Sequence, residues 1–206
     1  MPPNDRKPES PILLPILVII PFLTGSIADI DRRITSLVNS FTLYPRTHSE
    51  RMDCVDNLAK EWLSRYRLSG EKQDCDNAIL HYTEAILLLP VSRAEHLGNV
   101  VRHLFNLAIA LLERFEEFGQ PEDIKFSVEY LRYLRGMACD PFGVPRDDVT
   151  KSLIQALYLR VKKSDTGVGT RNIKEMMVLC RELLIPDLSA DFPIAASHFL
   201  SEAIWT

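Results

Sequence analysis

The chain has 206 residues, 46% of them hydrophobic and 25% charged, which is enough apolar material for one continuous core and too much for a disordered chain. A formal net charge of -4, with Lys and Arg scattered along the sequence, argues against a nucleic-acid partner. Eight glycines favour long helices over a turn-rich β protein. The four cysteines are far apart and form no CxxC pair, so we expect reduced thiols in an intracellular, cytoplasmic protein.

The N-terminal region combines a polar tail, residues 1–11, with an apolar run, residues 12–23. We expect the tail to be disordered. The run is shorter than the roughly 20 apolar residues that a membrane-spanning helix needs. It also contains Pro15 and Pro21, so we predict no membrane span. We predict instead a degenerate first helix that shields one end of the fold. Alternatively, residues 1–28 act as a signal peptide and the protein is secreted.

An internal repeat begins after this run. The segment that starts at Asn57 aligns without gaps with the segment that starts at Asn106, at an offset of 49. Seven of 23 aligned positions are identical, which is hard to produce by chance. The recurring residues are Asn57, Leu58, Ala59, Leu63, Arg65, Gly70 and Asp74, which correspond to Asn106, Leu107, Ala108, Leu112, Arg114, Gly119 and Asp123.

The same frame extends in both directions. Towards the N-terminus the offset is 45, and Gly25, Asp29, Asp31 and Ile34 correspond to Gly70, Asp74, Asp76 and Ile79. Towards the C-terminus the match is looser, with Arg114 corresponding to Arg160 at an offset of 46. We therefore predict a single domain over residues 12–206, built from units at 12–45, 46–90, 91–141 and 142–187 and a final helix at 191–205.

Each unit is predicted to contain two helices, because its apolar residues recur at the i, i+3, i+4 and i+7 positions of one helix face. Gly70 and Gly119 follow the first helices, where a C-terminal cap favours positive φ. Asp74 and Asp123 come next, where a carboxylate can cap the second helix or interact with its dipole. Three prolines are expected to end second helices, namely Pro45, Pro90 and Pro186.

One second helix contains the pattern Ala78-x3-Tyr82-x2-Ala85-x4-Pro90, which resembles the second-helix signature of the tetratricopeptide repeat. With its longer period and its NLAxxLxxRF first helix, the chain looks like the tetratricopeptide-like arrays of mushroom-forming fungi, which often precede a caspase-like CHAT domain. This resemblance implies an all-α superhelix of about four helix pairs that serves as an intracellular interaction scaffold. It implies no catalytic residues here, because the chain ends at Thr206 without a protease domain.

Residues typical of catalysis or metal binding form no convincing group. The sequence contains no GxxxxGK[ST], GxGxxG, HExxH or GxSxG motif. His96 and His103 lie seven residues apart on one predicted helix face, but no Glu or Cys completes a metal set, so we expect them at the surface or in a groove. We therefore expect neither enzymatic activity nor a cofactor.

The recurring arginines allow two interpretations. In the first, they line a groove formed by the first helices and bind a peptide or helix of a partner protein. In the second, each arginine ties its first helix to the next loop, for example to Asp74 or Asp123. The expected protein-binding residues are Arg65, Arg102, His103, Arg114 and Arg160. An alternative function is a structural or regulatory fragment of a larger array that self-associates end to end.

Overall fold

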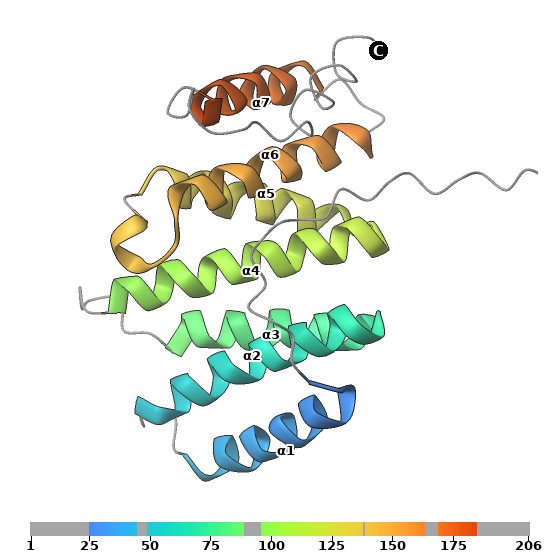
Figure 1. The fold of residues 1–206 in the computed structure, drawn as a ribbon, viewed down its shortest axis with the longest axis vertical. Helices are drawn as coiled ribbons and strands as arrows, with labels where there is room; N and C mark the ends of the chain where they lie inside the picture. The colour runs from blue at the N-terminus through green and yellow to red at the C-terminus, as the bar shows by residue number, and fades with distance from the viewer. Residues whose placement is uncertain (1–24, 45–48, 89–95, 138, 164–168, 185–206) are drawn as a thin grey trace, which may run out of the picture. The chain divides into compact units, whose positions relative to one another are not determined.

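The computed structural model describes residues 25–44, 49–88, 96–137, 139–163 and 169–184, which all lie in one compact unit, Leu23–Ala190. These residues contain α-helices and short 3-10 segments and no strand. The fold is therefore all-α, as predicted (Figure 1). The elements are α1 (Ile27–Leu43), α2 (Ser49–Ser69), α3 (Lys72–Leu88), α4 (Leu97–Phe118), α5 (Pro121–Arg135), η2 (Asp140–Phe142), α6 (Arg146–Lys162) and α7 (Gly169–Leu184).

Each helix packs on the next helix in the sequence, from α1 to α7, so the fold is an α–α superhelix (Figure 1). In the described part of the chain, α1 is followed by three pairs, α2–α3, α4–α5 and α6–α7. The two central pairs share a register of 49 residues, because α2 ends at Ser69 and α4 at Phe118. The helices that open these three pairs, α2, α4 and α6, are called first helices below. The others, α1, α3, α5 and α7, are called second helices.

Glycine ends the first helices of the two central pairs. Gly70 has φ +72° and Gly119 has φ +70°, the left-handed conformation predicted from the sequence. Their backbone N–H groups donate to the carbonyl oxygens of Tyr66 at 2.7 Å and of Phe115 at 2.8 Å. A side chain at either position would strain the backbone. The tight turn lets α3 and α5 fold back against α2 and α4.

Side chains also start α1. The Ser26 hydroxyl accepts a hydrogen bond from the Asp29 backbone N–H at 3.3 Å, and the Asp29 carboxylate accepts one from the Ser26 backbone N–H at 3.0 Å. This reciprocal capping box satisfies two N–H groups that have no partner within the helix. Gly25, Ser26 and Asp29 therefore mark a helix start, at the position that the repeat predicts.

Apolar side chains pack between successive helices. One cluster joins α1 to α2, a second joins α2, α3 and α4, and the third extends from α4 to α7. Small residues stand where helices approach closely, and Ala59, Ala78 and Ala108 have no exposed surface. The described residues contain no disulfide, and burial raises the pKa of the Cys75 thiol to about 12. That thiol is therefore a core group rather than a nucleophile.

Several predictions concern residues outside the described part of the chain. Helices α1, α3 and α7 end two residues before Pro45, Pro90 and Pro186, which are themselves outside it. The other such predictions are the tail at 1–11, the apolar run at 12–23 and the final helix at 191–205. Among the described helices, none is both long enough and apolar enough to cross a membrane.

Candidate functional site

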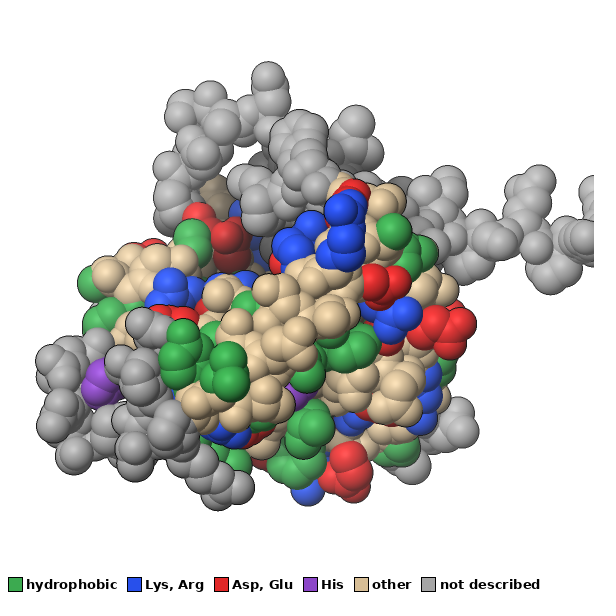
Figure 2. Space-filling model, turned by 90° about the horizontal axis from the view of Figure 1, so that it is seen from below, with side chains coloured by type: hydrophobic (Ala, Val, Ile, Leu, Met, Phe, Trp, Pro, Cys, Tyr) green, Lys and Arg blue, Asp and Glu red, His purple; other side chains and the backbone are tan. Residues whose placement is uncertain are grey.

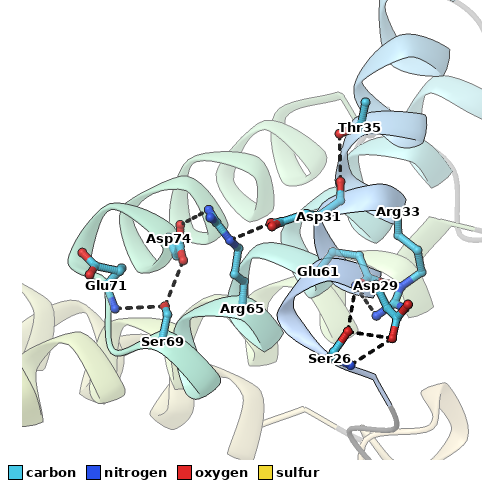
Figure 3. Close-up of polar contacts among 10 residues, drawn as sticks. All are labelled: Ser26, Asp29, Asp31, Arg33, Thr35, Glu61, Arg65, Ser69, Glu71 and Asp74. Atoms are coloured by element: carbon cyan, nitrogen blue, oxygen red, sulfur yellow. Dashed lines mark hydrogen bonds and ion pairs between the residues drawn. The ribbon is translucent and has the colours of Figure 1, made fainter.

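Arg65 of α2 lies between two carboxylates from neighbouring helices (Figure 3). Its Nη1 donates to Asp74 Oδ1 of α3 at 3.0 Å, and its Nε lies 2.9 Å from Asp31 Oδ1 of α1. The Ser69 hydroxyl donates to the other oxygen of Asp74 at 3.1 Å. The Asp74 side chain is only 4% exposed, so its charge depends on these partners.

Arg114 of α4 repeats the arrangement one unit later. Its Nε and Nη2 donate to the two carboxylate oxygens of Asp123 at 2.7 Å each, and its Nη1 donates to Asp76 Oδ1 at 2.6 Å. The hydrogen bond with Asp123 is the main reason that the pKa of the guanidinium is raised. Paired hydrogen bonds of this kind are among the strongest that side chains form.

We call these two groups the arginine bridges: Asp31–Arg65–Asp74 and Asp76–Arg114–Asp123. Each bridge connects a first helix to its own second helix and to the second helix of the preceding unit. The ion pairs with Asp74 and Asp123 are those of the second interpretation of the recurring arginines. The guanidinium groups of Arg65 and Arg114 are therefore already engaged within the array.

Arg160 forms no bridge with the described residues. At the offset of 49 that relates Asp74 to Asp123, the next unit has Asn172, and Asp76 is followed by Lys125. One acidic position has thus become neutral and the other basic. Asn172 is only 2% exposed, and Asp123 is 3% exposed. The side-chain N–H2 group of Asn172 has no hydrogen-bond partner among the described residues.

His103, one of the expected protein-binding residues, lies inside the fold, so our expectation of a position at the surface or in a groove was wrong. It is 2% exposed, and its Nδ1 lies 3.0 Å from Asp56 Oδ1 of α2. Burial raises the pKa of Asp56, but hydrogen bonds with His103 and Lys60 outweigh burial and leave that pKa below its ordinary value. His103 thus joins α4 to α2. His103 lies between two first helices, α2 and α4. The helical pattern of α4 alone did not predict this position.

Arg102 is the exposed member of the predicted set. It donates a hydrogen bond to Asn99 within α4. One turn further along α4 lies half-buried Asn106, whose counterpart in α2 is exposed Asn57. Neither amide forms a hydrogen bond with another described residue. The two asparagines recur in the repeat alignment, which is the sequence signal for them, although they are not among the residues predicted to bind a partner.

Other parts of the described surface do not form an enclosed binding site. Seen from the α1 end, hydrophobic side chains lie in separate groups between charged and polar side chains (Figure 2). A depression open to solvent is lined there by Asp29, Arg32, Arg33 and Ser36, and Arg33 is itself bonded to Glu61 of α2 at 2.8 and 2.9 Å. Within the described residues, no group of three or more His, Cys, Asp or Glu side chains could hold a metal ion.

The array was also compared with known proteins. No family model, no curated protein and no solved structure matches this chain. Any function must therefore be argued from the fold and from its surface.

Proposed function

We propose that this chain is a tetratricopeptide-like protein-interaction scaffold that binds an extended segment of a partner protein across α2 and α4. The observation that carries the proposal is the pair Asn57 and Asn106. These amides occupy the same repeat position on successive first helices, and neither is used by a hydrogen bond within the described residues. The proposed role is binding rather than catalysis.

Helices α2 and α4 are held to one another by polar contacts. Arg67 of α2 donates from Nη2 to Glu113 Oε1 of α4 at 2.6 Å, and its Nε lies 3.2 Å from both carboxylate oxygens. The Asp56–His103 contact joins the same two helices nearer the other end of α2. A surface fixed in this way loses little conformational entropy when a ligand binds.

The exposed amide and cationic side chains suit an extended acidic segment of a partner. A side-chain amide has donors and an acceptor, so Asn57 and Asn106 match the alternating N–H and C=O groups of a peptide backbone. Arg102 and Lys60 are exposed and carry positive charge close to these amides in the sequence, and Lys60 is also paired with Asp56. Cationic side chains at the rim would favour acidic partners and speed their association.

In this proposal, the cysteines indicate the cellular compartment of the scaffold. No disulfide joins cysteines within the described residues, which supports an intracellular, cytoplasmic location. A scaffold there would meet the disordered acidic segments of other cytoplasmic proteins, which bind by ordering along such surfaces.

The test uses a displayed library of random peptides selected on the full chain. We expect enriched peptides to be acidic and to bind the double variant Asn57→Ala/Asn106→Ala about tenfold or more weakly, as the loss of two hydrogen bonds implies. The matched control is Asn39→Ala/Gln73→Ala, which removes two exposed amides from the second helices α1 and α3. Circular dichroism would show that both variants remain folded.

Affinity for a selected peptide should also fall in Arg102→Glu, and more steeply at low salt than at high salt. If no peptide is enriched, or if the control variant loses as much affinity as Asn57→Ala/Asn106→Ala, the proposed surface is wrong.

A further inference from the structure

Helix α7 carries a line of cationic side chains that no described residue neutralises. Arg171, Lys174 and Arg181 are exposed, and Val178, which is 52% exposed, lies between the last two. Spacings of three and seven residues place the three cations on one face of the helix. None of them forms an ion pair or a hydrogen bond with another described residue. We call Arg171, Lys174 and Arg181 the α7 cations.

The carboxylates of α7 are engaged with the neighbouring second helix instead. Glu175 accepts hydrogen bonds from Arg132 of α5 at 2.9 and 2.6 Å, and Glu182 is paired with Arg135 of α5. These two glutamates are the acidic residues of α7. Because α5 compensates both of them, the α7 cations leave a positively charged surface on a chain whose formal net charge is -4.

The repeat indicates that the fold does not require cations at these positions. The offset of 49 that relates Asp123 to Asn172 also gives the equivalents of the α7 cations. On α5 they are Glu122, Lys125 and Arg132, and on α3 they are Gln73, Asp76 and Thr83.

Helix α3 has no cation in this set. On α5, Lys125 lies 3.9 Å from a carboxylate oxygen of Glu122, and Arg132 lies 2.6 Å from one of Glu175. The array therefore packs with a neutral, an acidic or a paired side chain at these exposed positions. The unpaired positive charge belongs to α7 alone among these three helices, so we looked for a binding role.

The length of the line favours a chain over a single small anion. At a rise of about 1.5 Å per residue, Arg171 and Arg181 are about 15 Å apart along the helix axis. About five residues of an extended peptide cover that distance. Val178 adds an apolar contact between two of the positive charges. An acidic segment with an aliphatic residue among its carboxylates matches this surface in charge and in shape.

Other polyanions match the surface less well. A helix that binds a membrane inserts large apolar residues beneath its cations. In α7, Met176 and Leu179 are buried in the core, and Val178 is the only exposed large apolar side chain among the described residues of the helix. A nucleic acid presents a phosphate backbone, which would neutralise only three cations here and would gain nothing from Val178.

We propose that the α7 cations form a docking surface for an acidic segment of a partner protein, with an aliphatic residue of that segment against Val178. The surface lies on a second helix, whereas Asn57 and Asn106 lie on first helices. It is therefore separate from the α2–α4 surface proposed above and does not depend on it.

The probe is the fluorescein-labelled peptide Glu-Asp-Glu-Leu-Glu-Asp-Glu, and its affinity for the full chain is measured by fluorescence anisotropy at low salt. Every protein in the series carries Asn57→Ala/Asn106→Ala, so that the α2–α4 surface does not contribute. We expect Arg171→Gln/Lys174→Gln/Arg181→Gln to weaken binding about tenfold or more, because three modest ion pairs are lost together. The melting temperature should not change, since the removed charges are exposed and unpaired.

The matched control is Arg32→Gln/Arg146→Gln/Lys151→Gln, which removes three exposed cations elsewhere on the array and changes the net charge equally. It should weaken binding about twofold at most, because distant charges are screened. A carbodiimide, which joins an amine to a carboxylate in contact with it, should cross-link the peptide to Lys174.

Four results would overturn the proposal. The peptide does not bind, or its neutral counterpart Gln-Asn-Gln-Leu-Gln-Asn-Gln binds equally well. The control variant loses as much affinity as the α7 variant, which would assign the effect to net charge. The cross-links avoid Lys174. Single-stranded oligothymidine or phosphatidylserine vesicles bind through the α7 cations more tightly than the peptide does, which would make the partner a nucleic acid or a membrane.

Discussion

The two halves of the array are joined by different polar contacts. From α1 to α5, each junction between units contains an arginine bridge, with Arg65 or Arg114 between two aspartates. From α5 to α7 the described residues form no such bridge, and the ion pairs Arg132–Glu175 and Arg135–Glu182 join the second helices instead. The apolar contacts continue through both halves, since one cluster extends from α4 to α7.

This difference shows which contacts every repeat unit requires and which contacts a unit can lose. A helix pair of this size must bury its apolar face against its neighbours, so every unit keeps apolar residues at equivalent positions. A polar tie is optional, provided that no charge is left buried without a partner. In the second half, Asn172 fills the buried aspartate position without charge, and the arginine is no longer required there.

The largest expected effect comes from breaking an arginine bridge. Arg114→Ala leaves Asp123, whose side chain is 4% exposed, as a buried charge without its main partner. We expect the free energy of unfolding to fall by about 3 kcal/mol. Urea titration followed by circular dichroism measures it.

The comparison variant is Arg160→Ala, which removes an arginine without a bridge and should cost less than about 0.5 kcal/mol. Equal losses in the two variants would show that the bridge adds nothing beyond the packing of the arginine stem. Peptides selected on the wild type should bind folded Arg114→Ala with unchanged affinity, since the proposed binding surface does not include Arg114.

A smaller effect is expected from the ion pairs of the second half. Arg132 donates to both oxygens of Glu175, at 2.9 and 2.6 Å, but its side chain is 36% exposed. Solvent weakens such pairs, so Arg132→Ala should cost about 0.5 kcal/mol, and the cost should decrease with added salt. Melting temperatures in low and high salt measure the difference. A loss as large as that of Arg114→Ala would contradict the contrast between the two halves.

The smallest effect is a pH dependence confined to the first half. Burial lowers the pKa of His81 below its ordinary value of 6.5, and nearby Glu84 opposes the shift only in part. Protonation is therefore easier in the unfolded chain, so His81 reduces stability as the pH falls from 6.5 through its folded pKa. His81→Gln removes this contribution.

Hydrogen exchange at pH 7 and at pH 5.5 would locate the effect. Between pH 7 and pH 5.5, the amide protection of α3 should fall more in the parent chain than in His81→Gln. The protection of α5, α6 and α7, which contain no histidine, should change equally in both proteins. A parent chain and a His81→Gln variant with the same loss in α3 would contradict the assignment.

Much of the fold could be predicted because its determinants are local. Gly70 and Gly119 end helices by backbone conformation alone, and Arg65 and Asp74 lie nine residues apart across one short turn. Repetition of the same spacing made these contacts visible without a structure. The second partner of each arginine was not visible. Asp31 and Asp76 reach Arg65 and Arg114 across the boundary between units, and that distance depends on how the units stack.

The candidate site shows the same limit of prediction from the sequence. Arg102 and His103 are adjacent in the sequence, yet one is exposed and the other is 2% exposed against Asp56. A helical pattern places a residue on a face, but only the neighbouring helix decides whether that face meets solvent. The amides of Asn57 and Asn106 recur in the alignment, and the structure adds that no described neighbour uses them.

The sequence by itself determined the helices, their caps and the repeat, because backbone conformation and apolar periodicity act over a few residues. The tertiary structure alone decided which charges pair between units and that His103 is buried. These features depend on the angle and spacing between stacked helices. That geometry is set by all the side chains at an interface together, and no short stretch of sequence specifies it.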